Sequence, residues 1–566
     1  MRHLALGLMP KNATPENFLA AGPWCFCGQE KDFPDWPKKF TFAPEPLASS
    51  SRLPAAARAA QTLAVRMVRP MTQRLYEKAD MLPAAYWQIL LMPWLIDVAA
   101  QIVERSLRLD AMINIWGENK LAVTVLPRQC KFDFQDEHDF TLRGSLGSTF
   151  NHWLFSSMLR DRKPDSWILE ELPEPVQNRQ STSPSTLADM LRKKAREISL
   201  RLLFPVAKGM SSIQALRFSQ SLNHRCNTPD HSLDLDTAFN YQSDLDAISL
   251  PDDIEAIFWL TMPASIKKLR HGAIKTDKSA PRLRMVNIVA HENCRYRQRL
   301  ARWRAQGNRL AHSQHGGNYG MLKTGCASEL VEYSQDIFFT WGWTTHGQHK
   351  GNFIALPSVQ LSKELNSGNP QKDAALIFIG TEMSAYGHRL DSLPTPMQYV
   401  DYREAKAVFF RELAPEIQLH SFYRPYFPLP GTLEDAQWLL PQFSFLRLCK
   451  GKLLPQLLNC KLAVIDHHGT TLLETMAADV PILLYWDRKA WPLTAEAEIL
   501  LDILEEAGIW HPDPSAAARK ANEIWHAPQK WWQSSEVRSA RNIFCKHQAL
   551  AVPNPDPAWI TTLQQL

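Results

Sequence analysis

One segment, residues 462–487, combines an apolar run, a polar turn and a small-residue helix in an order that suits phosphate binding. The apolar run ends at Asp466 and predicts a strand, and a helix is predicted after the turn. Backbone N–H groups at a helix N-terminus are free, and the helix dipole favours an anion there. The residues of the turn are therefore candidates for binding a phosphate: His467, His468, Gly469, Thr470 and Thr471.

Two carboxylates belong to the same segment. Glu474 lies three residues after Thr471, a spacing that fits a capping box at the helix start. Asp466, at the predicted strand end, is a candidate acid or base. The alternative is that a threonine only caps the helix. The stretch as a whole, with its small-residue helix and the strand after Pro481, resembles the donor-binding segment of GT-B glycosyltransferases. This resemblance favours a ligand-binding role, in which we include Glu474.

A second turn, in residues 309–320 (RLAHSQHGGNYG), also follows a predicted strand. His315 stands at the strand's carboxyl end and is a candidate catalytic group, while Gly316 and Gly317 allow a backbone approach that side chains would block. Tyr319 could stack on a base or a sugar. The alternative is an ordinary turn whose histidine hydrogen-bonds the backbone.

Other charged side chains are weaker candidates. Glu292, after the predicted strand 285–290, suits a general base or nucleophile, or else it interacts with a helix dipole. Arg295 and Arg297 fit a solvated face, and Arg424 could meet a phosphate or an acidic sugar. The Asp-Leu-Asp sequence at 234–236 lies in a polar loop, so we expect no metal site there.

The composition fits a globular protein that stays in the cell. The chain has 566 residues, 45% of them hydrophobic and 21% charged, with a formal net charge of +5. This balance argues against a nucleic-acid-binding arm, and nine scattered cysteines give no disulfide framework. The most apolar window, 82–103, contains Gln88, Pro93 and Asp97 and predicts a buried helix. We expect a cytoplasmic protein, with peripheral contact at the inner membrane as an alternative.

Short apolar runs alternate with helical stretches from residue 255 onward, which predicts parallel sheets covered by helices. A short strand is predicted at 17–21, and the strands of the alternating part begin with 257–261, 285–290, 310–314 and 337–341. After a polar linker at 361–372, others are predicted at 374–380, 417–422, 445–448, 462–466 and 482–486. The expected fold class is α/β of the GT-B type, with two Rossmann-like doubly wound domains, a cleft between them and an extended helical N-terminal insertion. The expected domains are 1–360, with the insertion at about 55–250, and 373–566.

Four motifs together resemble a family of bacterial transferases associated with surface-carbohydrate biosynthesis: FLAAGPWC, QHGGNYG, IFFTWGW and HHGTTLLETMAADVPIL. They spread from about residue 17 to residue 487. The pairing of a QHG turn with a C-terminal phosphate-binding helix also looks like capsule transferases that use CMP-activated Kdo or related nonulosonic acids. In GT-B sialyltransferases, adjacent hydroxyl residues at a helix start hold the CMP phosphate, and Thr470 and Thr471 match that pattern. The sialyltransferase acidic motif and HP dipeptide are not found at a strand end here.

The resemblance implies transfer of a nonulosonic acid (Kdo, pseudaminic or sialic-type) from a CMP-sugar to a bacterial surface polysaccharide. It implies a nucleotide sugar and an oligosaccharide or lipid-linked acceptor as partners, with no nucleic acid, no metal and no other cofactor. His468 would help bind the leaving phosphate, and Glu292 or His315 would act at the reacting carbon. Two alternatives stay open: a CDP-polyol phosphotransferase of the teichoic-acid type, and a non-catalytic nucleotide-sugar-binding protein.

Overall fold

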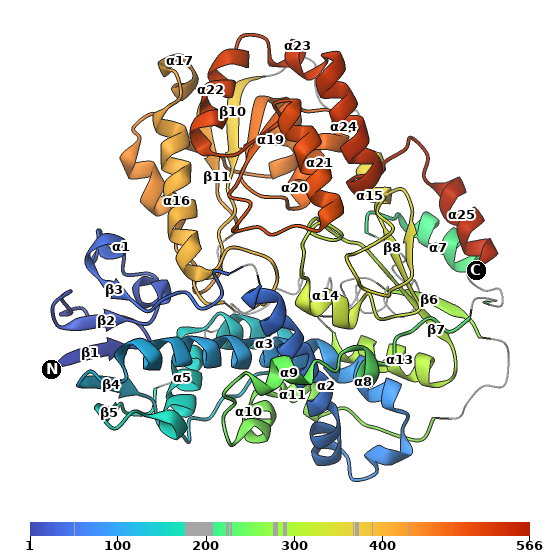
Figure 1. The fold of residues 1–566 in the computed structure, drawn as a ribbon. Coiled ribbons are helices and arrows are strands. Elements are labelled where there is room, and N and C mark those ends of the chain that lie inside the picture. Colours follow the sequence, from blue (N-terminus) through green and yellow to red (C-terminus); the bar gives the residue numbers. More distant parts are fainter. Residues whose placement is uncertain are drawn as a thin grey trace, which may run out of the picture.

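The computed structural model describes residues 1–49, 51–175, 208–221, 226, 229–274, 281–286, 291, 293–365, 367, 373–387, 389–427 and 429–566. The strands form three sheets, and neighbouring strands are parallel in each of them. Helices pack around the sheets (Figure 1). The predicted α/β class is therefore confirmed.

The first sheet, with its helices, forms the N-terminal lobe. Its order is β3-β2-β1-β4-β5. The strands are β1 (Arg2–Ala5), β2 (Phe18–Ala20), β3 (Thr41–Phe42), β4 (Leu121–Val125) and β5 (Trp167–Glu171). The helices are η1 (Pro23–Phe26), α1 (Trp36–Lys39), α2 (Arg52–Leu75), η2 (Ala79–Met81), α3 (Ala84–Trp116), α4 (Glu137–Asp139), η3 (Phe140–Ser145) and α5 (Ser148–Arg162).

The second sheet, in the order β6-β7-β8-β9, forms the central lobe. Its strands are β6 (Leu283–Val286), β7 (Arg309–Ser313), β8 (Ile337–Thr340) and β9 (Phe353–Ala355). The helices of this part of the chain are α7 (Ser212–Ser221), α8 (Leu235–Ala238), α9 (Gln242–Asp246), α10 (Ile254–Thr261), α11 (Ala264–Lys267), α13 (Cys294–Ala305), α14 (Cys326–Val331) and α15 (Val359–Glu364).

The third sheet forms the C-terminal lobe, in the order β12-β11-β10-β13-β14-β15. Its strands are β10 (Asp373–Ile379), β11 (Ser421–Arg424), β12 (Arg447–Leu448), β13 (Cys460–Ile465), β14 (Ile482–Tyr485) and β15 (Trp510–His511). The helices are α16 (Pro396–Arg411), α17 (Pro415–Gln418), α18 (Asp435–Leu439), η4 (Leu440–Gln442), α19 (Leu453–Asn459), α20 (Thr470–Ala477), α21 (Ala495–Glu506), α22 (Pro514–Ile524), α23 (Pro528–Trp532), α24 (Ser535–Gln548) and α25 (Asp556–Gln565).

Most of the predicted strands are confirmed, including 17–21, which contains β2. Of the strand predicted at 285–290, residues 285 and 286 belong to β6, and 287–290 lie outside the described residues. The prediction 417–422 begins too early, because Ile417 and Gln418 belong to α17 and β11 begins at Ser421.

The strand predicted at 257–261 is wrong. Residues 257–261 form the end of helix α10, where Ile257, Phe258 and Thr261 are buried at a helical spacing. A short apolar run has no periodicity that separates a buried strand from a buried helix, which explains the error. The linker predicted at 361–372 begins inside α15.

The predicted domain 1–360 is also corrected. It contains two parallel sheets instead of one, and the stretch expected as a helical insertion, about 55–250, contributes β4 and β5 to the first of them. The six strands of the third sheet all lie within the predicted domain 373–566. Helix α25, however, lies beside α7 and the central lobe (Figure 1).

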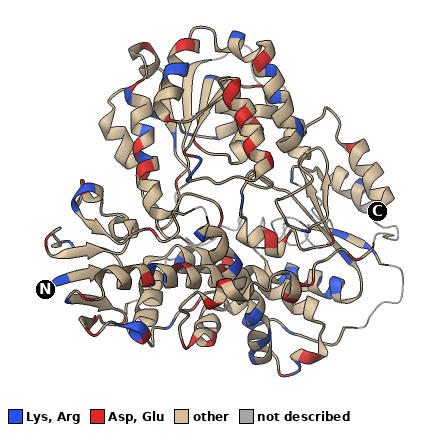
Figure 2. Ribbon diagram, viewed as in Figure 1, with Lys and Arg blue, Asp and Glu red and all other residues tan. Residues whose placement is uncertain are grey.

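Helix α3 runs through the middle of the molecule. By length and composition it could cross a membrane, but 83% of its most apolar window is buried inside the protein. The buried helix predicted there is confirmed. Basic and acidic residues are interspersed over the elements seen in Figure 2, which agrees with the balanced composition.

Candidate functional site

The C-terminal sheet has one place where the chain reverses its direction of winding. From β10 the chain winds outward through β11 and β12, and from β13 it winds the other way through β14 and β15. In open parallel sheets, ligands bind at the carboxyl ends of the strands beside such a switch point. The residues just past β10 and β13 are Gly380–Glu382 and Asp466–Gly469, so the predicted turn stands at this point.

Asp466 connects the two strand ends. Its side chain is fully buried, and its Oδ1 accepts hydrogen bonds from the Thr381 backbone N–H at 3.1 Å and from His467 Nδ1 at 3.0 Å. The ammonium group of Lys406 lies 3.7 Å from Oδ2. Asp466 thus fixes the orientation of His467 and is itself held in place by the fold.

Glu382 and Lys406 are buried titratable side chains close to the switch point. Lys406 donates to the Thr381 carbonyl at 2.7 Å and forms an ion pair with Asp435. Glu382 is 7% exposed, and no residue in the described part of the chain hydrogen-bonds its Oε1. Burial and the neighbouring Asp435 raise the pKa of Glu382 to about 8. Glu382 is therefore protonated at neutral pH.

The two turns singled out in the sequence meet in the structure. The Gly317 N–H donates to Thr470 Oγ1 at 2.9 Å, across 153 positions in the chain. A Cβ atom on Gly317 would lie 2.3 Å from the carbonyl carbon of Gly469, and one on Gly316 would lie 2.8 Å from Thr470 Oγ1. Only glycine permits this contact, so the QHGG turn lies directly on the N-terminus of α20.

The capping box predicted for α20 is not formed. Gly469 is the N-cap residue, so Glu474 lies more than a turn inside the helix. Its Oε1 accepts a hydrogen bond from Gln360 Nε2 of α15 at 2.5 Å. Glu474 therefore connects α20 to α15 and does not face the helix N-terminus.

Beside the QHGG turn lies a cluster that we call the Glu332 cluster: Glu332, His291, His315 and Tyr319. Glu332 Oε1 is 2.8 Å from His291 Nε2 and 3.4 Å from His315 Nε2, and the Tyr319 hydroxyl is 2.5 Å from the same His315 nitrogen. Burial alone would raise the pKa of Glu332, but the two histidines outweigh it and hold that pKa well below its usual range. A buried carboxylate thus orients His315.

Comparison with known proteins assigns the chain to a family. A family model described as LIC12162 family transferase matches residues 2–563. The chain belongs to the LIC12162 transferase family. No curated protein sequence matches it. Among solved structures, it is similar to a mutant of the Thermobaculum terrenum O-GlcNAc transferase, at 12% identity over 49% of this chain with a TM-score of 0.26. The match spans about half of that structure, 52% of its length.

Several predicted residues of this LIC12162-family transferase have structural roles. His468 is fully buried, its ring lies 4.7 Å from that of Trp491, and burial lowers its pKa to about 3. A neutral, enclosed imidazole cannot offer charge to a phosphate. Arg297 is buried rather than solvated, and it donates to the carbonyl of Leu90 at 3.0 Å. Glu292 lies outside the described residues.

Arg424, predicted to meet an anion, has its guanidinium turned to the backbone. It donates to the carbonyl of Cys449 at 3.1 Å and to that of Gly451 at 2.8 Å. The expectation that no HP dipeptide stands at a strand end is wrong, because His511 ends β15 and Pro512 follows it. Strand β15 is at the edge of the sheet, away from the switch point.

The cation that sequence reasoning missed is Arg389, in the loop between β10 and α16. It is exposed and makes no hydrogen bond or ion pair with another described residue. Burial raises the pKa values of Asp97 and Asp391, the latter to about 6, and the charge of Arg389 acts against both rises. It therefore lies within electrostatic reach of both carboxyls. A single arginine in a polar loop gives no sequence signal.

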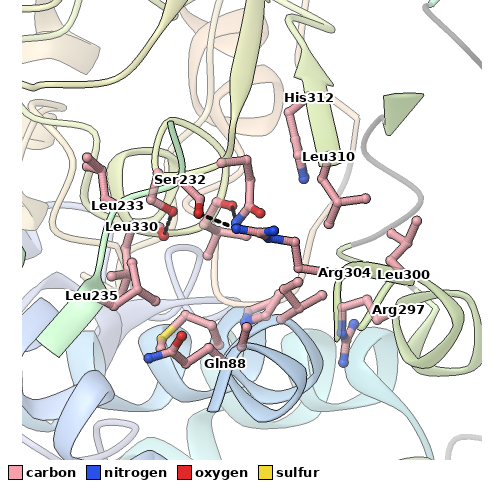
Figure 3. Close-up of a pocket in the computed structure, with 17 residues that line it drawn as sticks. Gln88, Ser232, Leu233, Leu235, Arg297, Leu300, Arg304, Leu310, His312 and Leu330 are labelled. Carbon is pink, nitrogen blue, oxygen red and sulfur yellow. Dashed lines mark hydrogen bonds between the residues drawn. The ribbon is translucent and has the colours of Figure 1, made fainter. Parts of the chain in front are cut away.

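A cavity of about 70 Å³ lies between α3, α13 and β7 (Figure 3). Its lining is mostly aliphatic, with His312 and Arg304 among the polar side chains. Burial lowers the pKa of His312 to about 4, so this side chain is neutral. The volume holds on the order of five water molecules, which is too little for a nucleotide.

Within the described ranges, no group of three or more His, Cys, Asp or Glu side chains is arranged to hold a metal ion. The Asp234 and Asp236 side chains of the Asp-Leu-Asp sequence lie at the start of α8, where Asp234 Oδ2 accepts a hydrogen bond from Thr237 at 2.7 Å. The expectation of a metal-free reaction remains a prediction.

Proposed function

We propose that this LIC12162-family transferase is a glycosyltransferase that moves a nonulosonic acid from a CMP-sugar to a bacterial surface polysaccharide, on the cytoplasmic side of the membrane. The observation that carries the proposal is the contact of the QHGG turn with the N-terminus of α20 at the switch point of the C-terminal sheet. Such a point is where a parallel sheet binds a nucleotide, and a helix N-terminus favours its phosphate. A GT-B arrangement, with donor and acceptor held by different lobes, is part of the proposal.

Donor binding follows from the donors at the start of α20. The backbone N–H groups of Thr470 and Thr471 have no hydrogen-bond partner among the described residues, whereas that of Leu472 donates to the Gly469 carbonyl at 3.2 Å. Gly316 and Gly317 place no side chain against this helix end. A hydroxyl can accept one hydrogen bond and donate another. Since Thr470 Oγ1 accepts from Gly317, its own hydrogen can be donated to a phosphate oxygen, and Thr471 supplies a second hydroxyl. This set stabilises the departing CMP phosphate without a cation.

His315 suits the role of general base. The His315 ring makes its two side-chain hydrogen bonds, to Glu332 and to Tyr319, at Nε2. We assign the proton to Nε2, so that Nδ1 carries the lone pair. In the reaction, the acceptor hydroxyl gives its proton to His315, its oxygen bonds to the anomeric carbon, and the bond from that carbon to the phosphate oxygen breaks. Glu332 stabilises the resulting imidazolium, as a carboxylate does in a catalytic triad.

The test is a comparison of nucleotides followed by product analysis. At one hundred times its dissociation constant, CMP should stabilise the fold by about 2.7 kcal/mol in the presence of EDTA. UDP and GDP at equal concentration should do less. Stabilisation that requires Mn²⁺ would contradict the metal-free site. With a CMP-nonulosonic acid and a glycan acceptor, the product should be a glycoside. A phosphodiester product from a CDP-polyol would establish the phosphotransferase instead, and nucleotide binding without turnover of either donor would indicate a non-catalytic binding protein.

A further inference from the structure

Two loops at the carboxyl edge of the C-terminal sheet form one surface. They follow the neighbouring strands β10 and β11. An antiparallel bridge joins Ser384 to Thr432, and the Ala385 N–H donates to the carbonyl of Gly431 at 2.7 Å. Gly431 has a left-handed φ of 67° and is packed so closely that a Cβ atom would lie 2.6 Å from the carbonyl oxygen of Leu146. The two loops are therefore fixed to each other and to the N-terminal lobe.

The loop after β11 presents two aromatic side chains to solvent. Tyr426 is 40% exposed and Phe427 is 60% exposed. Their rings stack with centroids 4.1 Å apart and planes inclined by 30°. Exposing two adjacent aromatic rings costs hydrophobic free energy, and rings of this kind on a surface mark a binding site when polar groups surround them.

The loop after β10 supplies the polar group. Burial raises the pKa of Tyr426, and the charge of Arg389 acts against this rise, so the guanidinium lies within electrostatic reach of the aromatic pair. The same charge acts against the rise in the pKa of Tyr319, whose hydroxyl contacts His315. The charge of Arg389 thus reaches both the aromatic pair and Tyr319, and Arg389 has no ion-pair partner among the described residues.

We infer that Tyr426, Phe427 and Arg389 form the subsite that holds the acceptor saccharide. The aromatic faces take the apolar C–H face of a sugar ring, and the guanidinium, with five N–H donors, binds the oxygens at the edge of that ring. This inference rests on the proposed function, because it names the acceptor of the same reaction. A saccharide fits better than a lipid surface, since an exposed arginine without an ion-pair partner among the described residues acts on the aromatic pair at the edge of the sheet where the donor is proposed to bind.

The test uses an array of defined bacterial surface oligosaccharides as the probe, with the full chain and no nucleotide. The wild-type protein should bind at least one glycan, and replacing both aromatics (Tyr426→Ala with Phe427→Ala) should weaken that binding by more than tenfold. Arg389→Gln should weaken it as well, and Arg389→Lys should do so less. Leu419→Ala is the matched control, because Leu419 is 67% exposed just before β11, at the opposite end of the same strand.

The outcomes separate the subsite from the proposed function. If CMP fails to stabilise the protein while glycan binding depends on the aromatic pair, the proposed donor is wrong and the subsite stands. Glycan binding that is unchanged in the double variant, or no glycan binding by the wild type, overturns the subsite. Cosedimentation with vesicles of phosphatidylglycerol that requires the aromatic pair also overturns it, because the pair would then be a membrane contact. Melting temperatures within about 2 °C of wild type show that the exposed substitutions leave the fold intact.

Discussion

At the scale of single residues, Glu382 makes stability depend on pH in an unusual direction. Its pKa is raised from 4.5 to about 8, mainly by burial. Between these values the unfolded chain loses a proton that the folded protein keeps, so this group's contribution to stability is complete below pH 4.5 and is lost as pH rises towards 8. A pKa that differs by one between the folded and unfolded states corresponds to about 1.4 kcal/mol. Glu382→Gln should therefore reduce the loss of stability between pH 5 and pH 8 by at least about 1 kcal/mol.

Urea unfolding at the two pH values measures this difference. The exposed Glu506, which forms no ion pair with another described residue, provides a control through Glu506→Gln, which should leave the pH dependence unchanged. An equal loss of stability in wild type and Glu382→Gln would show that Glu382 is ionised in the fold.

His315 carries the residue-scale prediction about chemistry. Its side chain is 17% exposed and is oriented by the buried Glu332. His315→Ala should lower the transfer rate by roughly 100-fold or more, the usual contribution of a general base, with CMP binding unchanged. The control is His526→Ala, since the His526 side chain is 76% exposed and lies two residues past the end of α22, outside the site. Transfer rates measured with a CMP-sugar donor test this role. Full activity of His315→Ala would show that His315 is an ordinary turn histidine and not the general base.

The sequence identified His315, Gly317 and Thr470 because strand, turn and helix signals surround them. It could not show that Gly317 and Thr470 touch, since that contact depends on how two lobes pack. Glu332 and Arg389 were missed for a different reason. Glu332 follows a short helix and Arg389 lies in a loop, so neither belongs to a motif, and only the fold brings them to the site.

At the scale of elements, the close contact between the QHGG turn and α20 predicts that a larger side chain at Gly317 destabilises the protein. A methyl group on Gly317 would overlap the backbone of Gly469 and Thr470, at 2.3 and 2.5 Å. Backbone atoms cannot rotate away as a side chain can, so Gly317→Ala should force the two elements apart. We expect a loss of stability of about 1–3 kcal/mol, typical of overpacking, and loss of transfer.

Gly272→Ala is the matched control for this substitution. No heavy atom lies within 4 Å of the position that its Cβ would take, and its φ is not left-handed. Its stability should stay within about 0.5 kcal/mol of wild type. Thermal denaturation of the two variants side by side measures the effect, and equal melting temperatures would mean that the turn and the helix are not in fixed contact.

Element length explains which parts of the fold were predictable. Strands β10 and β13 have seven and six residues of mostly apolar sequence, and both lie within two residues of their predicted ends. Strands β1 and β3 have four and two residues, too few for a periodic pattern. The N-terminal sheet also pairs β1 with β4, whose residues lie far apart in the sequence, so the sequence predicts a helical insertion in its place.

At the scale of the whole molecule, buried charges join the lobes. Arg105 of α3 donates to the carbonyl of Gly387, in the loop after β10, at 2.7 Å, and Arg108 binds Glu45 in two hydrogen bonds of 2.9 Å. Glu104 lies between the two arginines. Removing one member of such a network leaves an uncompensated buried charge, which is costly. The arrangement fixes α3 of the N-terminal lobe against the loop of the C-terminal lobe that carries Arg389.

The last helix connects the lobes in another way. Trp559 of α25 is 1% exposed, its indole N–H donates to the carbonyl of Pro357 at 2.8 Å, and its ring lies 5.2 Å from that of Phe339 in β8. Because the preceding helices belong to the C-terminal lobe, α25 ties that lobe to the central one (Figure 1).

Replacing Trp559 with alanine (Trp559→Ala) should lower the free energy of unfolding by about 3–5 kcal/mol and lower the transfer rate, since the QHGG turn and α20 belong to the two lobes that α25 joins. Ile543→Ala, at a 39% exposed position of α24, should change neither. Denaturant unfolding and transfer rates test both variants; normal transfer by Trp559→Ala would show that α25 stabilises only the central lobe and does not hold the site together.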